Sequence, residues 1–200
     1  MLLKSFLLAS SFALTSLAAS TPGSITAKYD EFTTDATGLY GPPPDPYLDL
    51  EYANWAIVSR SQTASVGGLK AQSGNNYIIH SALNARGAQG SFSVAAPFKT
   101  ATFSGFYFGC VVNDENGIAD VPTRCTITAK AYTKAGAQVA TYSITFTPPG
   151  VGVTTNPVPL APVTLPASFK GANIFRVNIT SDQPTLQAVF IDNLGYAVSK

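Results

Sequence analysis

The amino-acid sequence predicts an all-β protein, a single-domain antiparallel β-sandwich of about ten strands. After residues 1–19, apolar residues recur with a period of two, and no segment keeps a helical period. Gly, Pro and Asn separate the alternating segments at short intervals, as turns separate strands. Only 12% of the residues are charged, so Ser, Thr, Asn and Gln must supply most of the polar surface. Many short strands in one domain of this size favour two packed sheets, a sandwich or jelly roll.

Residues 1–19 have the features of a secretory signal peptide. Lys4 supplies a positive charge near the start, Leu2–Leu17 is largely apolar, and Ser16-Leu17-Ala18 or Ala18-Ala19-Ser20 offers a cleavage site. The stretch is too short and too rich in Ser to cross a membrane, and no second long apolar run follows. We therefore expect an extracellular, secreted domain at residues 20–200, with no membrane partner.

The charge balance excludes two classes of partner. The chain has 12 Lys and Arg against 11 Asp and Glu, and loss of Lys4 with the leader makes the two equal. No basic cluster stands out along the sequence. Binding to nucleic acid or to acidic lipids depends on such clusters, so we expect neither.

The two cysteines, Cys110 and Cys125, are expected to form a disulfide. Oxidising compartments favour this bond, and a loop of that length contributes roughly 3 kcal/mol in the chain-entropy model. A free nucleophilic thiol is the alternative, but no His lies nearby in the sequence to activate one.

Asn178 belongs to the one N-glycosylation sequon, Asn178-Ile179-Thr180. The predicted strand Asn173–Thr180 places Phe175, Val177 and Ile179 on its inner side. Asn178 then points outward, where it can carry a glycan.

The strands vary in the clarity of their pattern. The clearest pair is a hairpin, in which Thr126–Tyr132 turns at Lys134-Ala135-Gly136 into Gln138–Thr147. Thr100–Val112 is also a strong strand. Weaker strand patterns cover Ser24–Phe32, Tyr52–Ser59, Tyr77–Ser81, Gly90–Ala95, Val163–Phe169 and Asn173–Thr180. The Pro-rich segments Gly38–Pro46 and Pro148–Pro162 cannot form central strands and are expected to run over the surface.

The last predicted strand, Leu186–Val198, carries Asp192 and Asn193 in the middle of an apolar run. A buried polar group there needs a hydrogen bond or a cation. One interpretation is a structural calcium site, with Asp30, Asp192 and Asn193 as oxygen ligands where the first and last strands meet. The other is that Asp192 accepts backbone N–H bonds at a strand end or bulge, while Asn193 caps the turn at Gly195.

Short motifs across the chain resemble those of a family of fungal secreted β-sandwich proteins, a galactose-binding-like or carbohydrate-binding-module-like jelly roll. Tyr29-Asp30-Glu31-Phe32 is similar to the "FDDL" opening, and Pro46–Trp55 to the "Y-x-G-L-x-W-x-N-F" element. Ser73–Asn76 resembles the "S-G-x-N" step, and Phe190–Leu194 the closing "f-x-l-D-N-l". The resemblance implies carbohydrate binding and a calcium ion between the terminal strands. The chain departs from the pattern in having Asp30-Glu31 in place of paired Asp, and in its cysteine-bounded loop.

Aromatic residues gather around the first Pro-rich segment. Tyr40, Tyr47, Tyr52 and Trp55 lie within a few residues of it, and exposed rings can stack on the apolar faces of sugars. Tyr40 and Tyr47 are the candidate ligand-binding residues. Trp55 is expected in the core, because it alternates with Ala53 and Ile57.

No catalytic motif supports an enzyme. The single His, His80, lies in a plain strand pattern without a nucleophile elbow, and nothing in the sequence selects a pair of carboxylates. We therefore expect a secreted, non-catalytic protein that binds carbohydrate or cell wall and requires no cofactor. The alternatives are an extracellular effector or elicitor that contacts a host protein, and a glycoside-acting enzyme.

Overall fold

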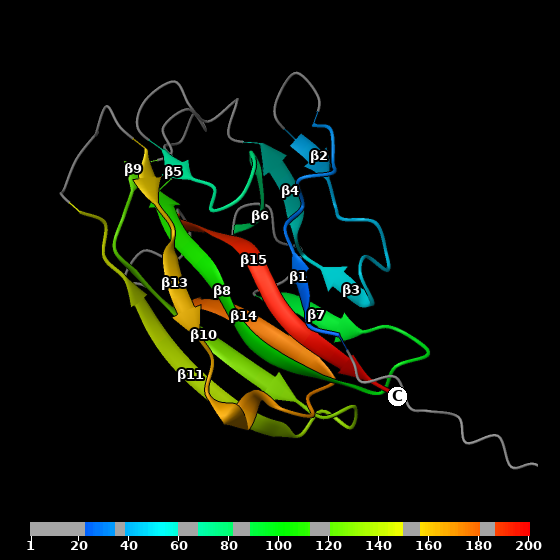
Figure 1. Ribbon diagram of the computed structural model, residues 1–200. Coiled ribbons are helices and arrows are strands. Elements are labelled where there is room, and N and C mark those ends of the chain that lie inside the picture. The colour runs from blue at the N-terminus through cyan, green and yellow to red at the C-terminus, as the bar shows by residue number, and fades with distance from the viewer. Residues whose placement is uncertain are drawn as a thin grey trace, which may run out of the picture.

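The computed structural model describes residues 23–34, 39–59, 68–81, 89–112, 121–149, 157–180 and 187–200. The all-β prediction is confirmed: two antiparallel sheets pack against each other around one hydrophobic core (Figure 1). No helix in these ranges has the length and apolar character needed to cross a membrane. The expected signal peptide lies outside the described residues.

The larger sheet is built around its two longest strands, which pair antiparallel along most of their length. Strand order is β13-β8-β15-β6-β4-β2, with β1 paired to β15 and β9 to β8. The strands are β1 (Ile25–Ala27), β2 (Leu39–Gly41), β4 (Ala56–Ser59), β6 (Asn76–Ser81), β8 (Thr100–Val112), β9 (Val121–Pro122), β13 (Ala161–Thr164) and β15 (Gln187–Ser199). Figure 1 shows β8 in green beside β15 in red, so the chain's last strand lies at the centre of this sheet.

The smaller sheet has five strands in the order β11-β10-β14-β7-β3. They are β3 (Leu50–Ala53), β7 (Gly90–Val94), β10 (Cys125–Tyr132), β11 (Gln138–Phe146) and β14 (Ile174–Thr180). The hairpin predicted from the sequence is β10–β11, and it closes through a turn in which Gly136 has a φ of 84°. A short parallel pair, β5 (Leu69–Lys70) with β12 (Val158–Pro159), completes the strands.

Aromatic side chains from both sheets fill the space between them. Phe103 of β8 stacks on Phe175 of β14, with ring centroids 4.7 Å apart. Phe175 also contacts Phe92 and Phe106, and all four rings are at most 2% exposed. The contacts of Phe103 and Phe106 with Phe175 join strands of opposite sheets, so apolar burial in this layer holds the sandwich together.

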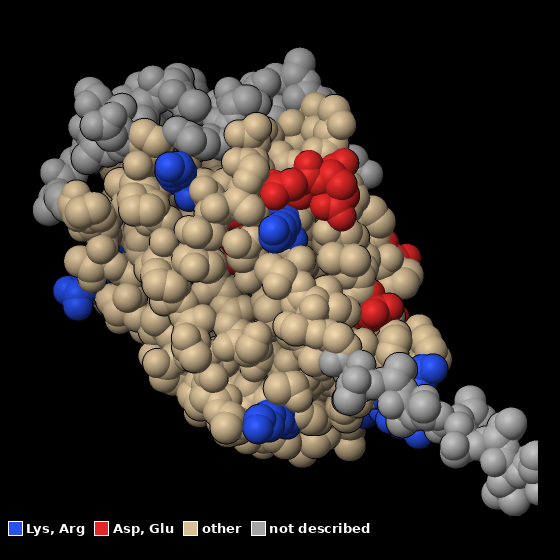
Figure 2. Space-filling model, in the orientation of Figure 1, with Lys and Arg blue, Asp and Glu red and all other residues tan. Residues whose placement is uncertain are grey.

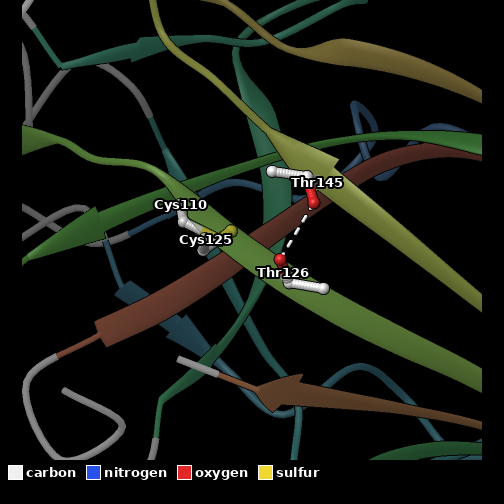
Figure 3. The surroundings of a disulfide bond; sticks show 4 residues. All are labelled: Cys110, Cys125, Thr126 and Thr145. Atoms are coloured by element: carbon white, nitrogen blue, oxygen red, sulfur yellow. Dashed lines mark hydrogen bonds between the residues drawn. A yellow bond between two sulfur atoms is a disulfide. The ribbon is translucent and has the colours of Figure 1, made fainter. Parts of the chain in front are cut away.

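The expected disulfide is present and also joins the two sheets. Cys110 belongs to β8 of the larger sheet and Cys125 to β10 of the smaller one, as Figure 3 shows. Both residues are buried, at 0% and 3% exposed. The bond therefore crosses the core rather than merely closing a surface loop.

Three predicted strands were wrong in extent. Tyr52–Ser59 is not one strand, because Asn54 has a φ of 63° and the chain crosses there from β3 in one sheet to β4 in the other. Val163–Phe169 ends as a strand at Thr164, and Ala167–Phe169 forms a 3₁₀ turn. Ser24–Phe32 contains only the short β1, and Tyr29 then turns with a φ of 64°.

The Pro-rich segments hold short strands at sheet edges. β2 begins the first segment and β13 ends the second, and both occupy the ends of the larger sheet's strand order. Pro162 lacks the N–H that a central strand needs, which explains the edge position of β13.

Candidate functional site

Asp192, the charged residue in the last strand, is fully buried and bound entirely by protein donors. Its Oδ2 accepts the backbone N–H of Gln72 at 2.8 Å and of Ser73 at 2.9 Å. Its Oδ1 accepts the backbone N–H of Asn193 at 2.7 Å. The prediction that Asp192 accepts backbone hydrogen bonds at an irregular point of the strand is confirmed.

Asn193 forms the irregular point itself. Its φ is 51°, and the register with β8 shifts between Asp192 and Gly195, as in a β-bulge. Its Oδ1 accepts a hydrogen bond from the hydroxyl of Ser73 at 2.8 Å. The side chain thus binds the Ser73 loop instead of capping the turn at Gly195.

The same loop holds the opening segment of the domain. The Asn76 side-chain amide donates to the carbonyl oxygens of Tyr29 at 2.9 Å and Phe32 at 2.7 Å. In addition, β1 pairs directly with β15. We call residues 29–32, 72–76 and 192–193 together the terminal clasp, because the middle loop ties both ends of the chain.

Asp30 lies close to Asp192 in this clasp. A Cβ added to Gly74 would come within 2.1 Å of the Asp30 Oδ1, so that carboxylate rests against the glycine. The pKa of Asp192 is raised to about 6, chiefly by burial; the three backbone N–H donors act in the opposite direction, and the negative charge of Asp30 adds a smaller upward contribution. The face seen in Figure 2 has sparse charge apart from an acidic patch beside β1.

Two of the three expected calcium ligands already have protein hydrogen-bond donors. Both oxygens of Asp192 already accept N–H groups, and the Oδ1 of Asn193 already accepts the Ser73 hydroxyl. These hydrogen bonds satisfy the buried oxygens without a cation, and calcium binding at the terminal clasp stays a prediction. Among the described residues, no group of three or more His, Cys, Asp or Glu is placed to hold a metal.

The aromatic residues around the first Pro-rich segment are mostly interior. Tyr47 is only 8% exposed, and its hydroxyl donates to Glu31 Oε1 at 2.6 Å, so the expectation of an exposed ring there is wrong. The ring packs against Tyr29, Phe32 and Tyr52, which explains its burial. The side chain of Tyr40 lies outside the described residues.

Trp55 belongs to the core, as expected from the sequence. It is 4% exposed and stacks on Phe92 with centroids 5.0 Å apart. His80 packs edge-on against the same indole at 5.6 Å. Its Nδ1 lies 2.8 Å from the Asn54 carbonyl oxygen, and because a carbonyl only accepts, Nδ1 carries the proton. Burial lowers the pKa of His80, which favours this neutral, structural ring.

The outward side of the smaller sheet carries mostly polar side chains, and we call it the hydroxyl face. Along β10 its members alternate strictly with buried residues, and on all five strands its members are partly or fully exposed. They are Glu51 and Ala53 of β3, Ser91 and Ser93 of β7, Ile174, Arg176 and Asn178 of β14, Thr126, Thr128, Lys130 and Tyr132 of β10, and Thr141, Ser143 and Thr145 of β11. Asn178 points outward here, as predicted for the sequon.

Cross-strand pairs organise the hydroxyls of this face. The Thr126 and Thr145 hydroxyls lie 2.9 Å apart, a contact drawn in Figure 3, and those of Thr128 and Ser143 lie 3.2 Å apart. At the other end of β10, the Arg176 guanidinium lies over the Tyr132 ring, 4.7 Å from its centroid. The face therefore presents hydroxyls at one end and an aromatic–guanidinium pair at the other.

The sequence alone did not single out this face. The alternation of Thr126, Thr128, Lys130 and Tyr132 with small buried residues was visible. The register that places Arg176 and Asn178 beside them depends on the pairing of β10 with β14, about fifty residues apart in the chain.

No family model matches this chain, and no curated protein matches it. Among solved structures, it is similar to a DUF4465 family protein from Bacteroides caccae, with a TM-score of 0.53 and 13% identity over 94% of this chain and 97% of that one. A weaker likeness, with a TM-score of 0.45 and 15% identity, is to the K2 cleaved adhesin domain of Lys-gingipain, over 86% and 97% of the two chains. The C-terminal family 22 carbohydrate binding module of Clostridium thermocellum Xyn10B has a TM-score of 0.36 and 11% identity, over 83% and 98%. The first likeness shows a shared β-sandwich fold.

Proposed function

We propose that this protein is a secreted, non-catalytic β-sandwich that binds polysaccharide through the hydroxyl face. The observation that carries the proposal is the continuity of this face: five neighbouring strands contribute outward side chains that are almost all polar and partly exposed. An open sheet face suits an extended polymer better than a single small sugar, which a concave pocket would enclose.

The side chains of the hydroxyl face match the chemistry of a sugar chain. Sugar hydroxyls both donate and accept hydrogen bonds, as do the hydroxyls of Thr128 and Ser143 and the amide of Asn178. Tyr132 adds an aromatic edge and apolar surface next to the Arg176 donors. The resemblance to galactose-binding-like sandwiches noted in the sequence points to the same class of ligand.

Binding without hydrolysis is the simpler proposal for this face. Glycoside hydrolysis uses two carboxyl groups placed on either side of the scissile bond. On the hydroxyl face, the described residues supply one carboxylate, Glu51, at the strand farthest from the β10–β11 hairpin. A contact between an effector and a host protein has no comparable structural support among the described residues.

Affinity electrophoresis in gels that contain insoluble or soluble cell-wall polysaccharides tests the proposal. Tyr132→Ala removes the aromatic ring and the support of Arg176, and we expect it to weaken binding about tenfold, equivalent to about 1.4 kcal/mol. The matched control is Tyr142→Ala on the neighbouring strand β11. Tyr142 is 38% exposed, and because it is the cross-strand partner of the buried Ala129, its side chain lies on the sheet face opposite to the hydroxyl face.

Two outcomes would overturn this function. One is that no polysaccharide retards the wild-type protein. The other is that Tyr142→Ala weakens binding as much as Tyr132→Ala does, while near-UV circular dichroism shows both variants folded.

A further inference from the structure

Two cations lie directly opposite each other on the hydroxyl face. Lys130 of β10 is the cross-strand partner of Arg176 of β14, and both side chains are partly exposed. From this pair we propose that the ligand is an anionic polysaccharide, one whose sugars carry carboxylate or sulfate groups. The inference rests on the proposed function and names the class of polymer bound at that face.

Like charges at directly opposed positions oppose folding. Such a pair is destabilising in a sheet, whereas opposite charges there contribute roughly 0.2 to 1 kcal/mol. In the part of the chain that the structure describes, neither Lys130 nor Arg176 has an ion pair with a carboxylate. An anion placed between the two cations would remove their repulsion. The binding of an anionic ligand therefore stabilises the folded protein.

Arg176 is held in a position suited to this task. The ring of Tyr132, diagonal to it across the two strands, lies beneath its guanidinium at 4.7 Å. The contact orders the side chain before a ligand arrives, so less conformational entropy is lost on binding. The planar guanidinium can bind a carboxylate through two parallel hydrogen bonds, and the Lys130 ammonium adds a point charge beside it.

The nearest acidic residue on the hydroxyl face is too far away to neutralise the pair. Glu51 lies on β3, two strands from β14, and neighbouring strands are about 4.8 Å apart. Its register partner is Ser93, which is paired in turn with Ile174 rather than with Arg176. The local potential at the pair is therefore positive even though the charges of the whole chain nearly balance.

Two charges suit a polysaccharide better than a nucleic acid. Nucleic acids carry a phosphate at each nucleotide and are bound by many Lys and Arg along one track. Here the two cations are flanked by uncharged neighbours, Thr128 on β10 and Asn178 on β14, that can bind the hydroxyl groups of a sugar. The combination fits a polymer with many hydroxyls and spaced negative groups.

The test compares polygalacturonate with the same polymer fully methyl-esterified, which keeps the backbone and removes the charge. We expect the acidic form to bind about tenfold more tightly in low salt, and the difference to shrink as salt screens the charges. Lys130→Gln and Arg176→Gln should each reduce the preference, and the double variant should bind both forms equally. Lys134→Gln and Lys170→Gln are the controls, because both lysines are exposed and lie outside the face.

The possible results separate this inference from the proposed function. Equal affinity for the charged and neutral forms of both polymer pairs, the polygalacturonates and the dextrans described below, overturns the anionic class and leaves polysaccharide binding intact, and so does an unchanged preference in the double variant. Failure of the protein to bind either form or any neutral polymer overturns both.

Two further polymers complete the test. A dextran and its sulfated form show whether sulfate replaces carboxylate, and tighter binding of either charged polymer than its neutral parent supports the inference. A single-stranded oligonucleotide of the same charge that binds as tightly as polygalacturonate would overturn the assignment to a sugar polymer.

Discussion

Asp192 illustrates how a single buried carboxylate can organise a chain closure. Three backbone N–H groups, two of them from the Ser73 loop, donate hydrogen bonds to its oxygens. These donors replace the water molecules that the carboxylate loses on folding. The cost of burying the charge nevertheless exceeds what these donors return, because its pKa rises to about 6. The residue is therefore both a structural anchor and a group whose charge state affects stability.

We predict that Asp192 makes the folded protein lose stability as pH rises through its titration. The folded state binds the proton of Asp192 more tightly than the unfolded chain does, because the pKa is about 6 in the folded state and 3.8 in the unfolded chain. The free energy of unfolding therefore falls between about pH 4 and pH 6. The size of this loss is about 3 kcal/mol. Urea unfolding at several pH values should show this slope in the wild type and its absence in Asp192→Asn.

Asp30→Asn is the matched variant for this prediction, because it removes the neighbouring negative charge and keeps Asp192. It should lower the pKa of Asp192 and shift the slope to lower pH. If the free energy of unfolding has the same pH dependence in the wild type and in Asp192→Asn, the slope does not come from Asp192.

Gly90 shows how one missing side chain makes room for the core. A Cβ at this position would lie 2.4 Å from the ring of Trp55. We expect Gly90→Ala to lower the free energy of unfolding by about 1 to 3 kcal/mol, because the indole must move within a packed core. Gly23→Ala is the control, since nothing lies within 4 Å of its added Cβ. Equal unfolding midpoints for the two variants in urea would contradict the expectation.

Among the strands, β14 places the sequon beside the proposed ligand. Asn178 is opposite Thr128 and two residues from Arg176 on the same face. Its Oδ1 is buried and accepts no hydrogen bond among the described residues. A glycan attached here would extend over the hydroxyl face from its middle.

We predict that a glycan on Asn178 weakens polysaccharide binding by covering that face. Protein from a glycosylating host should bind less tightly than the same protein after enzymatic removal of the glycan, and mass spectrometry would report occupancy. Asn178→Gln should bind as the deglycosylated protein does. Equal affinity of the glycosylated and deglycosylated forms would contradict the prediction.

Strand patterns were predictable where alternation and turn residues agreed. The β10–β11 hairpin and the long strand β8 follow directly from period-two sequences bounded by turns. The division of Tyr52–Ser59 was missed because its residues keep a strand composition while Asn54 adopts a left-handed conformation. Asn accepts that conformation more readily than most residues, so the signal was present but weak.

On the scale of the whole molecule, the disulfide has a different role from the loop closure expected of it. Cys110 and Cys125 join opposite sheets in the core, so the bond restrains both the unfolded chain and the separation of the layers. Replacing both cysteines by Ala should lower the free energy of unfolding by roughly 3 kcal/mol. Urea unfolding of the variant measures this, and reduced wild-type protein is the control. A urea midpoint that is unchanged both in the variant and in the reduced wild-type protein would contradict this prediction.

The sequence by itself determined the fold class and the disulfide partners, because alternation and cysteine count are local signals. That the first and last strands meet was implied by the resemblance to jelly rolls. The tertiary structure alone decided what Asp192 binds, whether Tyr47 is exposed, and which residues share the hydroxyl face. Those properties depend on partners such as Ser73 and Thr128, which are distant in the chain. Strand register and burial bring them together, and neither can be read from the neighbours of a residue along the sequence.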